Sequence, residues 1–260
     1  MSVISVPYFI GRFFDDFEVP QPAEVLAVDL PDEGSPDDPF RSEEPGDIGQ
    51  RRMAVLYGEL ATRVAASGPT VVYAGDCLAP IGVLAGLQRK GIVPTLYWFD
   101  AHGDFNTWET SESNFLGGMP LAMITARGEQ TIVEGTGMKP LPDERVVLVD
   151  ARDLDLKEGA AIAASGLTVM SVDDVAASEP PPGPIYVHVD VDVVDPTDLP
   201  AVNYPALGGP GAEEVQTAIA RLAATERVVA ASISSWNPAL PDAAKAAAVT
   251  RSIMEPLLKN

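Results

Sequence analysis

Two short acidic runs, each directly after an apolar segment, are the residues of this chain best suited to chemistry. Asp100, His102 and Asp104 follow the segment TLYWF, and Asp190 and Asp192 follow IYVHV. Alternate residues of an extended backbone point to the same side, so each run is expected to direct its side chains into one place. Carboxylates held together repel one another unless a cation lies between them. The two runs therefore predict a site for two divalent metal ions.

The donor types in these runs indicate which metal would bind. Carboxylate oxygens and one imidazole suit Mn²⁺ better than a soft metal ion. Asp is also common in turns, so the first run alone could be a polar loop. The second run opposes that interpretation, because Asp190 and Asp192 lie in a β-branched segment where unpaired buried charges would be costly.

The elements that must position these residues follow from the pattern of apolar runs. Short apolar runs alternate with segments of helical pattern, which favours an α/β fold with a mostly parallel sheet and helices on both faces. Strands are expected near residues 2, 70, 95, 145, 167, 185 and 227. Helices are expected over about 48–66, 79–90, 119–127, 156–165, 211–225 and 241–258. Both acidic runs and Gly75-Asp76-Cys77 lie at the carboxyl ends of predicted strands. In open α/β sheets, ligands bind at this edge of the sheet.

Composition limits the classes of partner and location. The 260 residues suit one domain over 1–260, with a long acidic, Pro-rich loop at about 19–49. The 17 basic and 38 acidic residues give a formal net charge of −21, which opposes binding to nucleic acid or to an anionic membrane. We expect no signal peptide and no spanning helix, because neither pattern is present. With Cys77 as the single cysteine, the expected location is cytoplasmic.

Four blocks of the sequence resemble the ureohydrolase superfamily, the arginases and agmatinases. In order they are GDCLAPIG (75–82), similar to the family's GGDHS; WFDAHGDFNT (98–107), similar to DAHxDxN; HVDVDVVDP (188–196), similar to SxDxDxxDP; and SSWNP (234–238), similar to ExNP. The resemblance implies a three-layer arginase-like fold with a sheet of about eight strands. It also implies a hydrolase of C–N bonds in a guanidino, hydroxyguanidino or related amidine compound, with two Mn²⁺ ions per chain and a homo-oligomeric assembly.

The resemblance assigns a role to each residue of the acidic runs. Asp100 and Asp190 would bridge the two manganese ions, Asp104 would bind one ion, and His102 and Asp192 would bind the other. A metal-bridging hydroxide would be the nucleophile, because two divalent cations lower the pKa of a shared water. Asp104 would also accept the proton of that water and pass it to the leaving nitrogen.

Three positions depart from the family pattern. Cys77 stands where the family has its remaining metal-binding histidine, and it is either a thiolate ligand or a passive buried thiol. Gly117 stands where arginases carry a histidine thought to shuttle protons, which leaves His188 as the candidate catalytic imidazole; a packing or positioning role for His188 is the alternative. Ser235 stands where the family has a glutamate that pairs with the guanidinium, and a serine cannot make that charged contact.

The candidate substrate-binding residues are Asn106, Ser113, Asp155 and Ser235. Asp155 ends an RDLD segment similar to the family's RDxD, whose last aspartate helps to hold the α-amino group of the substrate. A similarly placed Cys and Gly-Gly pattern occurs in the branch that acts on Nω-hydroxyarginine. Two other hypotheses remain open: an inactive ureohydrolase-fold protein with a binding or regulatory role, and a hydrolase of an imine or amide that lacks a full guanidinium.

Overall fold

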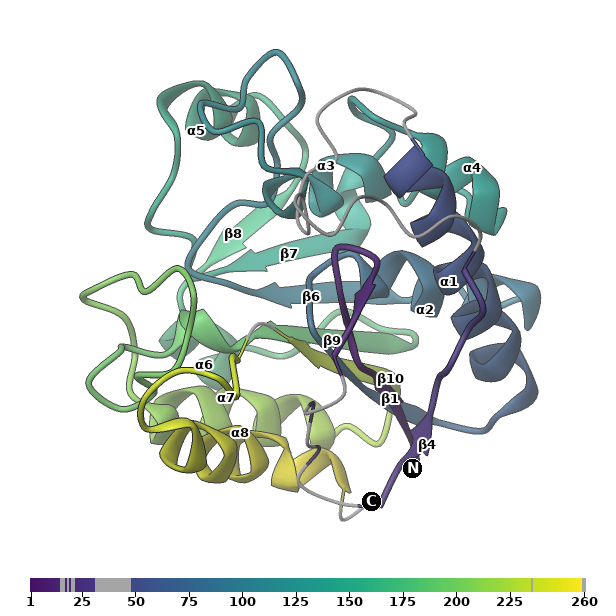
Figure 1. Cartoon of the computed structure of the whole chain (residues 1–260). Coiled ribbons are helices and arrows are strands. Elements are labelled where there is room, and N and C mark those ends of the chain that lie inside the picture. Colours follow the sequence, from purple (N-terminus) through teal and green to yellow (C-terminus); the bar gives the residue numbers. More distant parts are fainter. Residues whose placement is uncertain (15–16, 18, 20–21, 31–47, 235, 259–260) are drawn as a thin grey trace.

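The computed structural model describes all residues except 15–16, 18, 20–21, 31–47, 235 and 259–260. At its centre is an eight-stranded sheet in the order β4-β1-β5-β10-β9-β6-β7-β8, in which every neighbouring pair is parallel (Figure 1). Its strands are β1 Ser2–Val6, β4 Glu24–Val25, β5 Thr70–Ala74, β6 Thr95–Phe99, β7 Val146–Val149, β8 Thr168–Met170, β9 Ile185–Asp190 and β10 Val228–Ser234. A separate antiparallel hairpin pairs β2 (Tyr8–Phe9) with β3 (Arg12–Phe13).

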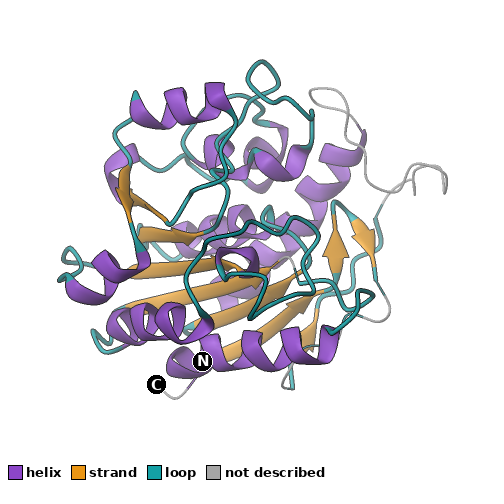
Figure 2. Ribbon diagram, turned by 90° about the vertical axis from the view of Figure 1, so that its left-hand side faces the viewer, coloured by secondary structure: helices purple, strands orange, loops and turns teal. Residues whose placement is uncertain are grey.

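Helices cover both faces of the sheet, so the molecule has three layers (Figures 1 and 2). The α-helices are α1 Ile48–Ala66, α2 Ala79–Arg89, α3 Pro120–Ile124, α4 Thr131–Thr136, α5 Leu156–Ala163, α6 Val172–Ala177, α7 Ala212–Ala223 and α8 Ala243–Leu258. Three short 3-10 helices are η1 Leu116–Gly118, η2 Asp143–Arg145 and η3 Val191–Val193. The predicted α/β fold with a mostly parallel sheet of about eight strands is confirmed.

Two apolar cores, one on each face, hold the sheet in place. Side chains of β6 alternate between them: Leu96 and Trp98 pack with α1 and α2, whereas Tyr97 and Phe99 pack with α6, α7 and α8. Because both faces are covered, strands β5, β6, β7 and β9 are buried at every position, which explains their nearly continuous apolar sequences. Each fully buried side chain of this size contributes roughly 1.5–3 kcal/mol. The strand ends are therefore firmly positioned.

All seven expected strands and all six expected helices are present, with small shifts of their ends. Helix α3 is shorter than the expected 119–127, because Ala126 and Gly128 have φ angles of +64° and +59°, which end the helical backbone. The expected loop over 19–49 is wrong at Glu24–Val25, which pairs with β1, and at Ile48, where α1 begins. Residues 20–21 and 31–47 of the expected loop lie outside the described residues.

Five strands and α-helices were not expected from the sequence. They are the β2–β3 hairpin, β4, α4 and α6, and each has six or fewer residues. Segments this short do not complete enough periods to give a recognisable pattern. Within the described part of the chain, no helix combines the length and hydropathy that a membrane crossing requires.

Candidate metal centre

The predicted ligands meet at one edge of the central sheet. Cys77 follows β5, Asp190 is the last residue of β9, and Asp100 follows β6. Strands β5, β10, β9 and β6 are consecutive in the sheet and all run in the same direction. Their carboxyl ends therefore lie side by side, as the ligand-binding edge of an open α/β sheet requires.

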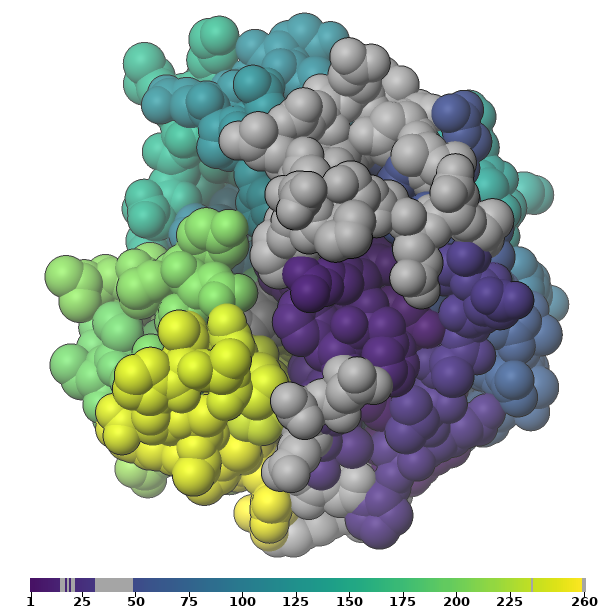
Figure 3. All heavy atoms as spheres, in the orientation of Figure 1, coloured from purple at the N-terminus to yellow at the C-terminus, as the bar shows by residue number. Residues whose placement is uncertain are grey.

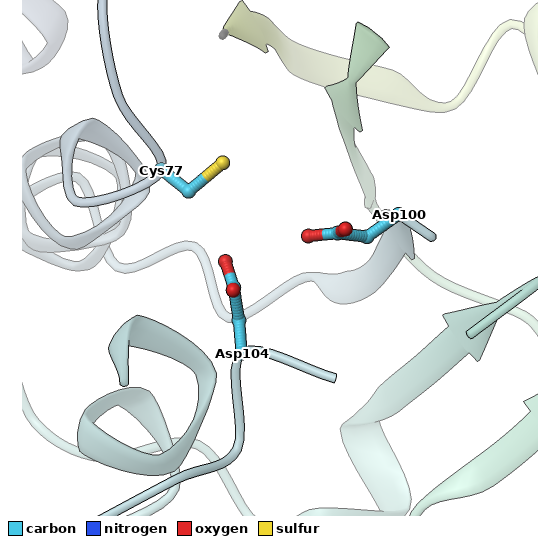
Figure 4. A group of neighbouring side chains, drawn as sticks. All are labelled: Cys77, Asp100 and Asp104. Carbon is cyan, nitrogen blue, oxygen red and sulfur yellow. The ribbon is translucent and has the colours of Figure 1, made fainter. Parts of the chain in front are cut away.

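Two groups of ligand atoms form at this edge, and they share Asp100. The ligand atoms of Cys77, Asp100 and Asp104 all lie within 4.8 Å of one another, and those of Asp100, His102 and Asp192 form a second such group. Figure 4 shows the side chains of the first group pointing toward one another from separate segments. One carboxylate between two ligand groups is the arrangement that a pair of adjacent divalent cations needs.

Asp104 has a carboxylate oxygen without a protein partner. Its Oδ2 atom is buried and accepts no hydrogen bond from the described residues, and the residue is only 6% exposed. Burial, and then the charges of Asp100 and Asp190, raise the pKa of Asp104 well above its usual range. The residue is held with a φ of +48° while its carbonyl accepts from the amides of Leu121 and Ala122 at the start of α3. The fold thus fixes a buried oxygen that a cation or a proton would satisfy.

The second group combines an imidazole with two carboxylates. His102 Nδ1 lies 3.5 Å from Asp100 Oδ1 and 3.2 Å from Asp192 Oδ2. Burial opposes protonation of His102, but hydrogen bonds to both carboxylates outweigh it and raise the pKa to about 12. Burial and the charge of Asp100 raise the pKa of Asp192 to about 6. Both shifts show that this group favours added positive charge, which a proton or a metal ion can supply.

Neighbouring donors fix the orientation of these carboxylates. Trp98 Nε1 donates to Asp100 Oδ2 at 3.0 Å, and the amide of His102 donates to Asp100 Oδ1 at 2.7 Å. The amide of Asp192 donates to Asp190 Oδ1 at 3.0 Å. Sequence reasoning missed Trp98, although its place two residues before Asp100, on the same side of an extended strand, was a usable signal.

Cys77 lies among polar partners inside the first ligand group. Its thiol donates to Asp190 Oδ2 at 2.8 Å, and Sγ lies 3.0 Å from Ser234 Oγ and 3.4 Å from His188 Nε2. Burial, and then the neighbouring carboxylates, raise the pKa of the thiol well above its usual range. The position therefore suits a ligand only if a bound cation replaces the thiol proton.

His188 lies behind Cys77 and does not line the cavity above the ligands. The ring is fully buried, with Nδ1 2.7 Å from Ser232 Oγ and its centroid 4.1 Å from that of Trp98. Burial lowers the pKa of His188 to about 3, so the imidazole is neutral. Of the two roles considered from the sequence, this position favours the positioning of Cys77 over direct contact with a substrate.

A cavity of about 370 Å³ opens above the ligand groups. Residues of both predicted kinds line it: Cys77, His102, Asp104, Asp190 and Asp192 from the ligand set, and Asn106, Ser113 and Asp155 from the substrate set. Asn106 Nδ2 donates to Asp155 Oδ2 at 3.1 Å, so two of the substrate candidates are joined. Ser235 lies outside the described residues.

Glu158 is a lining residue that the sequence analysis missed. Its Oε1 accepts the amide of Phe105 at 2.9 Å, and its Oε2 accepts the amide of Asp155 at 3.3 Å. Burial raises the pKa of Glu158 to about 7. The signal was its place three residues after Asp155, where a glutamate often bonds back to the start of a helix.

Asp76 has a structural part in the site. Its carboxylate accepts hydrogen bonds from the amide of Ile10 at 2.7 Å, the hydroxyl of Tyr57 at 2.7 Å and the amide of Leu78 at 2.9 Å. Ile10 lies in the turn of the β2–β3 hairpin, so Asp76 fastens that hairpin to the turn between β5 and α2. These hydrogen bonds explain why an aspartate lies next to Cys77, and they require no role for Asp76 as a metal ligand.

Comparison with known proteins identifies the family. Residues 39–258 match the sequence model of the arginase family. The chain belongs to the arginase family. At the level of the family, it is therefore a hydrolase, and the ureohydrolase resemblance of its four sequence blocks is confirmed.

Individual members of the arginase family agree with this assignment. The arginase of Bacillus caldovelox is 32% identical over 202 residues, which cover 71% of this chain and 66% of that protein. The N(omega)-hydroxy-L-arginine amidinohydrolase of Streptomyces lavendulae is 31% identical over 156 residues, or 58% of this chain and 55% of that protein. The alignments thus span about two thirds of the first relative and just over half of the second. The crystal structure of an arginase from Bacillus cereus has a TM-score of 0.78 at 25% identity and covers 100% of this chain and 98% of that chain.

Proposed function

We propose that this protein is a manganese-dependent hydrolase of C–N bonds in a guanidino, hydroxyguanidino or related amidine compound. The observation that carries the proposal is the pair of ligand groups that share Asp100, one of which includes the unpartnered oxygen of Asp104. Both groups lie beneath a cavity that can admit a small molecule. Membership of the arginase family supports hydrolysis and a two-ion centre.

The donor set fits two Mn²⁺ ions. The residues that would hold the two ions are Cys77, Asp100, His102, Asp104, Asp190 and Asp192. Carboxylates and imidazole suit Mn²⁺. A thiolate from Cys77 is a softer ligand, so the ion that it binds would have a softer ligand set than one with only oxygen and nitrogen donors. When bound, two such cations lower the pKa of a water molecule and polarise the carbon that it attacks.

The side chains of the chain then have distinct parts in the reaction. Asp104 lines the cavity and has a carboxylate oxygen with no partner among the described residues, which suits it to accept a proton. Asp104 takes a proton from the attacking water as the water oxygen bonds to the amidine carbon. It then gives that proton to the leaving nitrogen as the C–N bond breaks. Asn106, Ser113 and Asp155 would orient the substrate, and His188 would hold Cys77 in place.

Three further properties belong to the proposal. We propose that residues 1–260 form one domain and that the protein is cytoplasmic. We also propose that it forms a homo-oligomer and that its substrate is a small molecule. The single cysteine supports a reducing compartment, and the net charge of −21 supports a reaction that involves neither nucleic acid nor membrane. Light scattering of the purified protein tests the assembly, since a monomer at all concentrations would exclude it.

A substrate screen tests the proposed reaction. The protein is loaded with Mn²⁺ and incubated with guanidino, hydroxyguanidino and formimino compounds, and the release of urea, ammonia and amine is measured. We expect turnover of at least one class, and its loss in Asp104→Asn and in the presence of a chelator. Tight binding of two Mn²⁺ without turnover of any class would instead support an inactive binding protein.

A further inference from the structure

The backbone at Asp104 makes a turn in the left-handed region. Its φ of +48° is uncommon for residues other than glycine and is held at a cost in energy. The carbonyl of Asp104 accepts the amides of Leu121 and Ala122 at 2.9 and 3.1 Å, so α3 holds one side of the turn. The next amide along the chain, that of Phe105, has its partner in a different helix.

Glu158, in the first turn of α5, is the partner of the Phe105 amide. Its Oε1 atom accepts that amide at 2.9 Å, although the two residues are 53 positions apart in the sequence. The side chain of Glu158 is only 3% exposed. Gly103 lies against the same carboxylate, because a Cβ atom there would be 2.7 Å from Glu158 Oε1. Glu158 thus contacts the chain on both sides of Asp104.

Capping of α5 does not by itself explain the placement of Glu158. Its Oε2 atom accepts the amide of Asp155 at 3.3 Å, which completes a capping box at the start of the helix. Helix α6 has a comparable capping box, in which Asp174 Oδ2 accepts the amide of Ser171 at 3.2 Å. Asp174 caps its helix from an exposed position, whereas Glu158 is buried and uses its second oxygen for Phe105.

The two oxygens of Glu158 connect the metal side of the cavity to the substrate side. Asp155, which Glu158 holds through its amide, in turn accepts the amide of Glu112 at 3.4 Å. Figure 3 shows the teal segments near residues 110 and 160 next to each other on one side of the molecule. One buried carboxylate therefore joins the turn at the ligand groups to the start of the helix that carries a candidate substrate-binding residue.

We propose that Glu158 is a positioning residue for Asp104. Its bond to the Phe105 amide holds the left-handed turn, so that the Asp104 carboxylate points toward the other side chains of the first ligand group (Figure 4). Without this bond, a buried amide beside the turn would have no partner, and the turn would rearrange. The inference rests on the proposed function and adds to it a residue that lies outside both ligand groups.

Manganese binding in the absence of substrate tests this role. Titration calorimetry measures the two binding steps in the wild type, in Glu158→Ala and in Glu158→Gln. In Glu158→Ala, the step that involves Asp104 should weaken by about 10–100-fold, as for other residues that orient metal ligands, and the other step by less than about threefold. Glu158→Gln keeps an oxygen that can accept the Phe105 amide, so it should restore most of the lost affinity.

The pattern of these affinities separates positioning from other roles. A glutamate that acted only on a substrate, or only as a helix cap, would leave both binding steps unchanged. Unchanged affinities in Glu158→Ala, or an equal loss in both steps, would overturn the proposal.

Hydrogen exchange of the metal-free protein tests the turn directly and needs neither metal nor turnover. Exchange over residues 101–106, measured by mass spectrometry, should be about tenfold or more faster in Glu158→Ala, because the partner of the Phe105 amide is lost. Glu158→Gln should exchange at close to the wild-type rate. Equal exchange in all three proteins would contradict the proposal.

Asp174→Ala is the matched control, because it removes the corresponding carboxylate from the capping box of α6, outside the cavity lining. It should destabilise the protein slightly, as loss of a cap does, and leave Mn²⁺ affinity and exchange over residues 101–106 unchanged. If this control loses as much Mn²⁺ affinity as Glu158→Ala, the effect of Glu158 is general destabilisation and the positioning role is rejected.

The two measurements also separate this inference from the proposed function. Faster exchange in Glu158→Ala, with weaker binding of one ion, supports the positioning role even if none of the screened compounds is hydrolysed. Turnover by the wild type, with equal Mn²⁺ binding and equal exchange in Glu158→Ala, supports the proposed function and rejects the positioning role.

Discussion

At the scale of single residues, Asp104 has the environment that most requires a cation. Its buried oxygen without a partner and the nearby Asp100 and Asp190 make the charged form costly. Asp104→Asn keeps the shape but removes the charge, so Mn²⁺ affinity should fall by about tenfold or more. In a chelator above neutral pH, the same variant should be more stable than the wild type by about 1–3 kcal/mol. Titration calorimetry and urea unfolding measure the two effects, and a less stable metal-free variant would contradict the argument.

Cys77 is either a ligand or a passive thiol, and cobalt distinguishes the two roles. If Cys77 binds as a thiolate, the Co²⁺-loaded protein should show a sulfur-to-cobalt charge-transfer band in the near ultraviolet. Cys77→Ser should remove the band while Co²⁺ still binds to the group that contains His102 and Asp192. A wild-type protein with two bound Co²⁺ ions and no such band would show that the thiol is passive.

Glu158 should give the metal-free protein a specific pH dependence of stability. Burial raises the pKa of Glu158 from 4.5 to about 7, so the folded state holds the proton more tightly than the unfolded state. The stabilisation by protonated Glu158 is therefore complete below the pKa of this residue in the unfolded chain, and it is lost as the pH rises through about 7. Between about pH 5 and about pH 8, the wild type should lose about 2 kcal/mol relative to Glu158→Gln. If the free energies of unfolding of the two proteins change equally with pH across that range, the prediction is wrong.

At the scale of elements, the sequence predicts the long segments and the strand ends well, for a physical reason. Parallel strands covered on both faces are nearly continuous apolar runs, and Asp100 and Asp190 mark where β6 and β9 end, although both residues are buried. The ring contacts of Phe115 with Phe9 and Tyr204 were not predicted, because these residues meet only in three dimensions. No periodicity along the chain records such a contact.

Arg152 joins several elements near the ligands, and the sequence did not reveal this positioning role. Its guanidinium donates to Asp150 Oδ2 at 2.6 Å and to the carbonyls of Asp192 at 3.2 Å, Val193 at 3.1 Å and Ala206 at 2.9 Å. The side chain thus joins the end of β7 to η3, the turn that carries Asp192, and to the segment that leads on from it. Five donors in a planar fork make an arginine suited to this junction.

Loss of the Arg152 junction should weaken metal binding without unfolding the protein. Arg152→Met keeps an apolar stem but frees η3, so we expect Mn²⁺ affinity to fall by about 10–100-fold, as for other residues that orient ligands. Circular dichroism checks the fold and calorimetry the affinity. Arg63→Met removes an exposed arginine that pairs with Glu24 and Glu59, and this control should bind Mn²⁺ as the wild type does.

At the scale of the whole molecule, the site is built from strands distributed across the sheet. Cys77, Asp100 and Asp190 follow or end β5, β6 and β9, and β10 lies between β5 and β9. These elements pair only when the sheet is formed, so the unfolded chain cannot offer the two ligand groups together. Metal binding is therefore coupled to global folding, and its free energy adds to the stability of the entire chain.

This coupling predicts a large thermal shift on metal loading. An ion at about 100 times its dissociation constant stabilises the folded state by about 2.7 kcal/mol, which corresponds to roughly 5–10 °C for a protein of this size. Two ions in the two groups should give a shift that rises in two stages as Mn²⁺ is titrated. Because Asp100 belongs to both groups, Asp100→Asn should lose most of the whole shift, whereas Cys77→Ser should lose only the part that belongs to one ion. Calorimetric scans over a Mn²⁺ titration measure this, and an equal loss in the two variants would mean that the groups do not bind separate ions.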